Sequence, residues 1–108
     1  MVEYTLPLDY VFGSLADPTR RDILDRLRLG DLNVSEVAAP YTMSLAAVSK
    51  HLRILEQARL IVKRKAGKER IVALQPEAMR QAGEYMQQYE RLWNARLDRL
   101  DVFLKEDT

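Results

Sequence analysis

The 108-residue chain contains no cysteine and only one histidine, His51. Without cysteine there is no disulfide framework, no thiolate metal site and no thiol redox switch, so the sequence predicts no metal site and no cofactor. No stretch approaches the ~18 consecutive apolar residues of a membrane span, and the first residues lack the cationic and apolar runs of an export signal. These absences predict a cytoplasmic protein with no membrane partner.

Signatures of catalysis are missing as well. There is no glycine-rich phosphate loop, and the residues four positions from His51 are Ala47 and Leu55, which cannot orient it as a base. Internal repeats and low-complexity segments are also absent. We therefore expect a non-enzymatic protein with one domain spanning residues 1–108.

The positive charge of the chain is concentrated in one region. The formal net charge is only +1, but residues 41–70 carry a net charge of +6 and the remaining residues sum to −5. The cations of this region are Lys50, Arg53, Arg59, Lys63, Arg64, Lys65, Lys68 and Arg70. Because the field at a contact face governs attraction more than the total charge does, this distribution predicts a surface that attracts a polyanion.

Capping signals and apolar periodicity predict a series of short helices. Asp17 is a good N-cap before Pro18, Gly30 is a good stop, and Asn33 with Glu36 forms a capping-box variant. The predicted helices cover residues 7–16, Pro18 to about Leu29, one to two turns after Asn33 that end before Pro40, and Ser44 to about Ala58.

A hairpin and a long final helix follow. The predicted strands are Leu60–Lys65 and Glu69–Leu74, with Gly67 supplying the positive φ of the turn Ala66–Lys68. From Pro76 to about Leu104 an apolar stripe repeats at nearly 3.6 residues. Its members are Met79, Ala82, Met86, Tyr89, Trp93, Leu97, Leu100 and Leu104.

The final helix is too long for one small domain to cover. At 1.5 Å per residue it extends roughly 40 Å, whereas a 100-residue domain has a radius of gyration of about 13 Å. A second copy of the chain is the simplest cover, so the sequence predicts a homodimer. The predicted interface residues are Leu8, Phe12, Met86, Tyr89, Trp93, Leu97 and Leu100.

The helix after Ser44 has the pattern of a DNA-reading helix. Val48, Leu52 and Leu55 fall on one stripe, whereas polar and cationic residues face elsewhere. Together with the preceding short helix and the basic hairpin, it predicts a mainly α winged helix-turn-helix fold with a small β-hairpin and a double-stranded DNA partner. The predicted DNA contacts are Ser44, Leu45, Ala46, Ser49, Lys50, His51, Arg53, Lys65, Lys68 and Arg70.

Four segments carry a resemblance to the ArsR-type winged-helix regulators. They are LADPTRRDIL at 15–24, VSEVA at 34–38, MSLAAVSKHLRIL at 43–55, and the hairpin. The resemblance implies a homodimeric bacterial regulator, usually a repressor, that binds an inverted repeat and releases it when an inducer binds.

Several positions depart from the family pattern. Asn33 and Ser35 stand where arsenic- and cadmium-sensing members have cysteines, and the last helix has acidic residues but no histidine, so the resemblance implies a branch that does not sense metals. Leu45 and Ala46 replace a common Gln-Pro pair. Arg59 replaces a helix-ending glycine, which requires a non-glycine turn there unless Arg59 reaches phosphate.

Some alternatives stay open. His51 is either a DNA contact or a residue that hydrogen-bonds within the motif. The aromatic residues Phe12, Tyr85, Tyr89 and Trp93 are either plain interface core or the lining of a pocket for an unknown small-molecule inducer. A winged-helix module that docks on protein is the competing function, although a protein-binding hairpin would more often expose apolar residues than cations.

Overall fold

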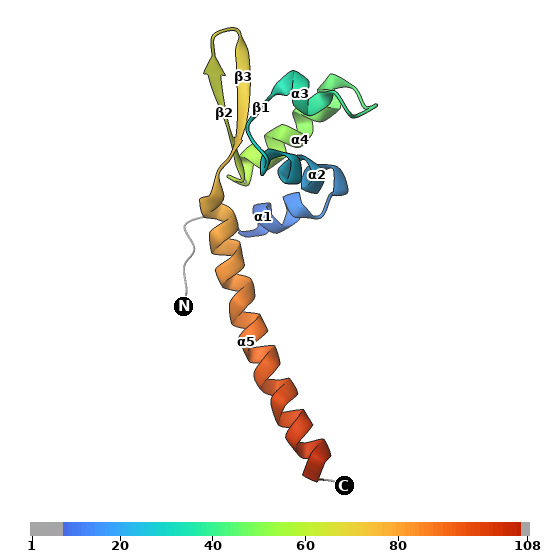
Figure 1. The fold of residues 1–108 in the computed structure, drawn as a ribbon, viewed down its shortest axis with the longest axis vertical. Helices are drawn as coiled ribbons and strands as arrows, with labels where there is room; N and C mark the ends of the chain where they lie inside the picture. The colour runs from blue at the N-terminus through green and yellow to red at the C-terminus, as the bar shows by residue number, and fades with distance from the viewer. Residues whose placement is uncertain (1–7, 107–108) are drawn as a thin grey trace.

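The computed structural model describes residues 8–106 of the chain. Figure 1 shows a body of short helices beside a hairpin, with one long helix projecting from it. The elements are α1 (Leu8–Leu15), α2 (Pro18–Leu27), β1 (Leu32–Asn33), α3 (Val34–Ala38), α4 (Leu45–Gln57), β2 (Ile61–Ala66), β3 (Glu69–Leu74) and α5 (Pro76–Glu106). The predicted mainly helical class is confirmed; Pro7, the first residue of the predicted helix 7–16, lies outside the described residues.

Side-chain caps determine where three helices begin. Asp17, Asn33 and Ser44 each accept a hydrogen bond from the backbone N–H three residues ahead, at 2.8–3.1 Å. The Glu36 carboxylate accepts from the Asn33 backbone N–H at 2.9 Å, which completes the predicted capping box. These local bonds satisfy N–H groups that would otherwise lack partners at the helix ends.

Helix α4 ends in a turn whose left-handed residue is Arg59, with φ 60°. The N–H of Leu60 donates to the Leu55 carbonyl and the N–H of Arg59 to the Glu56 carbonyl, both at 3.0 Å. This is the Schellman pattern, in which glycine usually occupies the left-handed position. The predicted helix end without glycine is therefore present. It redirects the chain from α4 toward strand β2 of the hairpin.

The hairpin belongs to a three-stranded antiparallel sheet with the order β1-β3-β2. Strand β1 was not predicted, because a two-residue strand that pairs Leu32 with Val72 leaves no periodic signal in the sequence. Strand β2 begins one residue later than predicted, and Gly67 has the expected positive φ, 63°.

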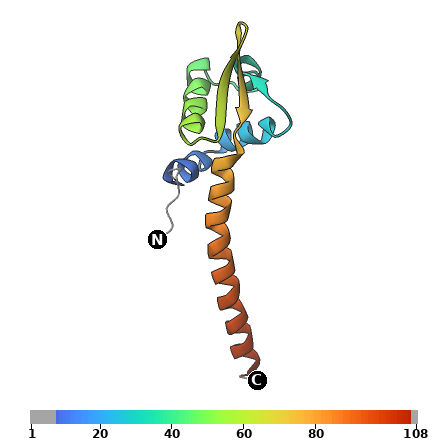
Figure 2. The ribbon, with the colours of Figure 1, turned by 90° about the vertical axis from the view of Figure 1, so that its left-hand side faces the viewer.

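One hydrophobic cluster packs the four helices α1, α2, α3 and α4 against the sheet. Val48, Leu52 and Leu55 are buried in it as predicted. By contrast, Ala78 and Ala82 are the buried residues of α5. The rest of α5 extends away from the body in both views, and the described chain measures 68 × 32 × 21 Å (Figures 1 and 2).

Candidate nucleic-acid interface

Helix α4 presents an exposed face opposite its buried stripe. Ala46, Lys50 and Arg53 are exposed on that face, and Leu45 is 61% exposed at the beginning of the helix. The first turn is fixed because the Ser44 hydroxyl oxygen accepts from the backbone of α4, which leaves the hydroxyl hydrogen free to donate. This face can offer one hydroxyl, two cations and a small apolar surface to a partner.

The two faces of the β2–β3 hairpin carry different cations. Successive side chains in a strand alternate, and Lys63 and Lys65 therefore share one face with Arg70, which pairs with Lys65 across the strands. Arg64 lies on the opposite face, where its guanidinium is 3.3 Å from the Asp31 carboxylate. Only part of the positive charge that the sequence assigned to the hairpin therefore faces α4.

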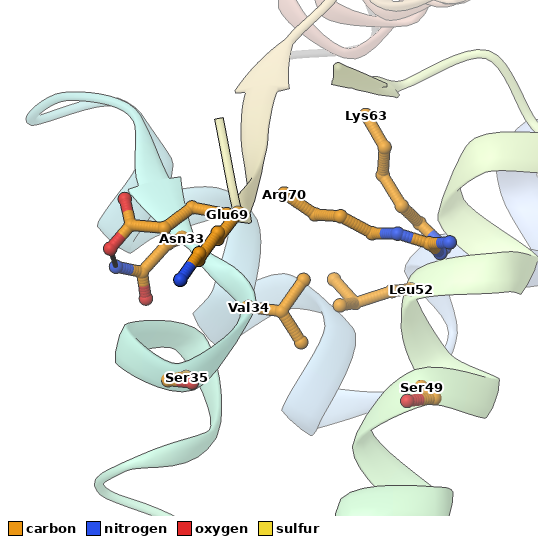
Figure 3. A pocket seen from close by; sticks show the side chains of 9 residues that line it. Asn33, Val34, Ser35, Ser49, Leu52, Lys63, Glu69 and Arg70 are labelled. Atoms are coloured by element: carbon orange, nitrogen blue, oxygen red, sulfur yellow. Dashed lines mark hydrogen bonds between the residues drawn. The ribbon is translucent and has the colours of Figure 1, made fainter. Parts of the chain in front are cut away.

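A groove of about 360 Å³ separates α3 and α4 from the hairpin (Figure 3). In Figure 3 the Lys63 and Arg70 side chains both extend toward α4, and Ser49 lies on the α4 side of the groove. Lys63 is 3.6 Å from the Glu56 carboxylate. The groove is lined by Asn33, Val34, Ser35, Ser49, Leu52, Lys63, Lys68, Glu69 and Arg70. Its three cations and two hydroxyls suit a phosphate backbone.

The structure brings Ser49, Lys68 and Arg70 together in this groove, while His51 faces the beginning of α2. Its Nδ1 is 3.2 Å from Nη1 of Arg20, and its side chain is 21% exposed. Because a guanidinium can only donate, Nδ1 accepts and the ring proton lies on Nε2. The Asp17 carboxylate, 3.9 Å from Nδ1, is too distant for a hydrogen bond. His51 therefore hydrogen-bonds within the motif, and Nε2–H is left as its donor to any further partner.

The Asp17 carboxyl lies beside the contact between Arg20 and His51, and its pKa is lowered. The hydrogen bond from the Arg20 backbone N–H outweighs the opposing effect of burial and holds the pKa of Asp17 below its ordinary value. The positive charge of Arg20 acts in the same direction. The carboxylate is therefore ionised at neutral pH and strengthens the cap of α2.

Sequence reasoning did not assign Asn33, Ser35 or Lys63 to the interface. The sequence marks Asn33 as a helix cap and as the replacement of a metal-binding cysteine, whereas in the structure its side-chain amide also donates to Glu69 of the hairpin at 3.4 Å. Ser35 was read only as a replaced metal ligand. Neither residue has a local signal for the groove, because α3 meets the hairpin only in the tertiary structure, through the pairing of β1 with β3 and its own contact with β3.

The residues predicted for a dimer interface lie along α1 and α5. Leu8 and Phe12 are half-buried, and the ring of Phe12 is 5.9 Å from that of Tyr85. Tyr85 in turn contacts Tyr89, with ring centroids 5.2 Å apart. From Met86 onward the apolar stripe is exposed: Met86, Tyr89, Trp93, Leu97, Leu100 and Leu104. Part of the aromatic group is thus stacked within one chain, whereas Trp93 is 62% exposed.

Two other kinds of site were sought in the described part of the chain. Within residues 8–106, no three His, Cys, Asp or Glu side chains lie close enough together to hold a metal ion. None of the described helices combines the length and the apolar character needed to cross a bilayer.

A polar-faced helix held against a preceding helix and flanked by a cationic hairpin defines a winged helix-turn-helix DNA-binding protein. Residues 17–63 match the model of the bacterial regulatory proteins of the arsR family. The chain is 43% identical over 79 residues to the HTH-type transcriptional regulator Rv2034 of Mycobacterium tuberculosis, covering 73% of each protein. It is 40% identical over 60 residues to the transcriptional repressor SdpR of Bacillus subtilis, covering 56% of this chain and 67% of SdpR.

Solved structures agree with these relatives. The crystal structure of the ArsR family transcriptional regulator RHA00566 superimposes with a TM-score of 0.80 at 36% identity, covering 87% of this chain and 97% of that one. The homodimeric winged helix-turn-helix domain Mb0332 of Mycobacterium bovis shares the fold, with a TM-score of 0.62 at 24% identity over 77% and 78% of the two chains. The chain belongs to the ArsR family and is a DNA-binding transcriptional regulator, which decides against the protein-docking alternative.

Proposed function

We propose that two copies of the chain pair through α1 and α5 and bind an inverted-repeat operator as a repressor. The observation that carries the pairing is the exposed apolar stripe of α5, from Met86 to Leu104, on the part of the helix that projects away from α4 and the hairpin (Figure 1). An apolar face of this length is rare on a monomer, and a second copy offers the same face. The homodimeric state of Mb0332 and the repressor activity of SdpR support this reading.

The predicted contacts divide into two kinds. We assign base reading to residues at the N-cap and in the first three turns of α4, because the early residues of a recognition helix reach base edges. They are Ser44, Leu45, Ala46, Ser49, Lys50 and Arg53. Phosphate contacts fall to Lys65, Lys68 and Arg70 of the hairpin, and His51 can add Nε2–H to a phosphate. Residues 1–108 act as one domain in this proposal, in the cytoplasm, without metal, cofactor or catalysis.

Selection of bound duplexes from a random pool by the purified protein tests the proposal. Two recognition helices related by a two-fold axis enter successive major grooves about 34 Å apart. The recovered sequences should therefore be inverted repeats with half-site centres roughly 10–10.5 bp apart. A single half-site that binds as tightly as the full repeat would show that the dimer is not the DNA-reading unit.

A further inference from the structure

A second cavity lies where α5 leaves the body. It has a volume of about 410 Å³ and shares no lining residue with the groove between α4 and the hairpin. Its apolar lining comes from four parts of the chain and consists of Leu15, Leu24, Leu60, Leu74, Pro76 and Met79. This volume is within the ordinary range for small-molecule sites, about 300–1,000 Å³.

The polar side of this cavity is formed by α2. Arg21, Asp25 and Arg28 follow one another at intervals of four and three residues, so that they share a face of the helix. The Arg21 guanidinium donates to the Leu15 carbonyl at 2.8 Å. Within residues 8–106 the Arg28 guanidinium has no hydrogen bond or ion pair, and it is exposed at the end of α2. The cavity therefore has an apolar interior and a cation available at its edge.

We propose that this cavity binds a small apolar carboxylate whose hydrocarbon part contacts the leucine lining and whose carboxylate pairs with Arg28. Charge favours an anion over a cation, because two arginines and a single carboxylate line the site. A guanidinium matches a carboxylate with two parallel hydrogen bonds.

The position of the cavity connects the ligand to the orientation of α5. The Gln75 N–H donates to the Leu60 carbonyl at 2.9 Å, and α5 begins at the next residue, Pro76. Ala78 and Ala82 are the buried residues of α5, and Tyr85 contacts Phe12 of α1, so the body holds this helix only along its first part. A ligand between α2 and Met79 therefore contacts both sides of the junction.

This coupling rests on the proposed function. In a dimer joined through α5, a change in the angle between α5 and the body changes the separation of the two α4 helices. A ligand that binds more tightly at one of two such angles shifts the population toward that angle. The size of the change in operator affinity is set by the difference between the ligand's affinities for the two angles.

Three probes with one hydrocarbon body test the site: 4-phenylbutyrate, 4-phenyl-1-butanol and 4-phenylbutylamine, titrated into the full-length protein without DNA and followed by calorimetry and NMR. We expect saturable binding of the anion, weaker binding of the alcohol, and about tenfold weaker anion binding by Arg28→Ala. Met79→Trp, which fills the cavity from an exposed position, should abolish binding. Arg96→Ala is the matched control, because Arg96 borders a different apolar surface near Trp93 on α5.

Several outcomes would overturn the assignment. The first is that wild-type protein that still binds its operator does not bind the anion. The second is that the anion and the alcohol bind equally, or that the amine binds most tightly. The third is that Arg96→Ala, and not Arg28→Ala, weakens binding of the anion. A change in dimer dissociation in Arg28→Ala, with no change in probe affinity, would make the cavity a surface between copies. If the probe binds and operator affinity does not change, the coupling is wrong. If no operator is found at all, the probe titrations still decide the site.

Discussion

The Arg20 guanidinium and the His51 imidazole lie 3.2 Å apart, Nη1 to Nδ1, and connect the first turn of α2 to the middle of α4. The same guanidinium donates to two carbonyls near the end of α1, from Nε to Ser14 at 2.8 Å and from Nη2 to Gly13 at 3.3 Å. One half-buried cation therefore fixes three helices relative to one another. The recognition helix is held in place by this contact as well as by its apolar stripe.

Replacing Arg20 should destabilise the protein more than replacing its neighbour. Arg20→Ala removes three contacts between elements, and we expect a loss of about 2 kcal/mol in the free energy of unfolding. Arg21→Ala removes a single exposed bond to a carbonyl and should cost less than about 1 kcal/mol. Urea denaturation measures both. Equal losses would show that the Arg20 contacts add nothing beyond those of an ordinary surface arginine.

Asp17 should make the free energy of unfolding depend on pH in the acid range. Its folded-state pKa is lowered, so the carboxylate stabilises the fold above its unfolded pKa, and this contribution is lost as the pH falls through the folded value. Asp17→Ala should cost about 1 kcal/mol at pH 7, the usual value of an N-cap. Asp17→Asn keeps a capping oxygen but not the charge. Thermal melts from pH 7 to pH 2 should fall more steeply for wild type than for Asp17→Asn; parallel curves would contradict the role of the charge.

Arg59→Gly should stabilise the protein. An L-residue at φ 60° carries a steric cost of roughly 1 kcal/mol that glycine avoids, and the side chain of Arg59 is exposed. The Schellman hydrogen bonds are made by the backbone and remain. Arg59→Ala retains the strained backbone and serves as the control, since its stability should stay near wild type in denaturant titrations. A stability gain in Arg59→Ala equal to that in Arg59→Gly would mean that the arginine side chain, not its backbone, is unfavourable.

The salt dependence of DNA binding should separate two cations of the hairpin. Lys68 lines the groove, whereas Arg64 lies on the other face beside Asp31. If Lys68 contacts phosphate, Lys68→Ala should weaken all sequences about equally and reduce the slope of log K against log salt by about 1. Arg64→Ala should leave the slope unchanged. A shift in sequence preference with an unaltered slope in Lys68→Ala would assign that residue to base reading.

A charge within the α5 stripe should separate the two copies. Trp93→Asp replaces a large apolar surface with a carboxylate that pairing would bury without a partner, at a cost of several kcal/mol. Sedimentation should show a monomer at micromolar concentration, and operator affinity should fall to the non-specific level. Val102→Asp is the control, because Val102 is also exposed but lies half a turn around α5 from Trp93. A Trp93→Asp protein that stays dimeric would exclude α5 as the main interface.

The sequence by itself determined most of the fold, because the signals are local. An N-cap such as Asp17 acts on the next turn, Gly67 permits the hairpin turn through its own φ, and the spacing of Val48, Leu52 and Leu55 fixes the inward face of α4. The length of the last helix and its apolar stripe could be read in the same way. Each of these features depends on residues within a few positions of one another.

The tertiary structure alone decided which residues meet across the chain. Strand β1 exists only because Leu32 finds Val72 on β3, and that pairing brings α3 to the groove. The turn of His51 toward Arg20, the placement of Arg64 away from α4, and the cavity between α2 and α5 likewise depend on residues separated by more than thirty positions. Such contacts are set by packing and strand register, which local propensity does not encode.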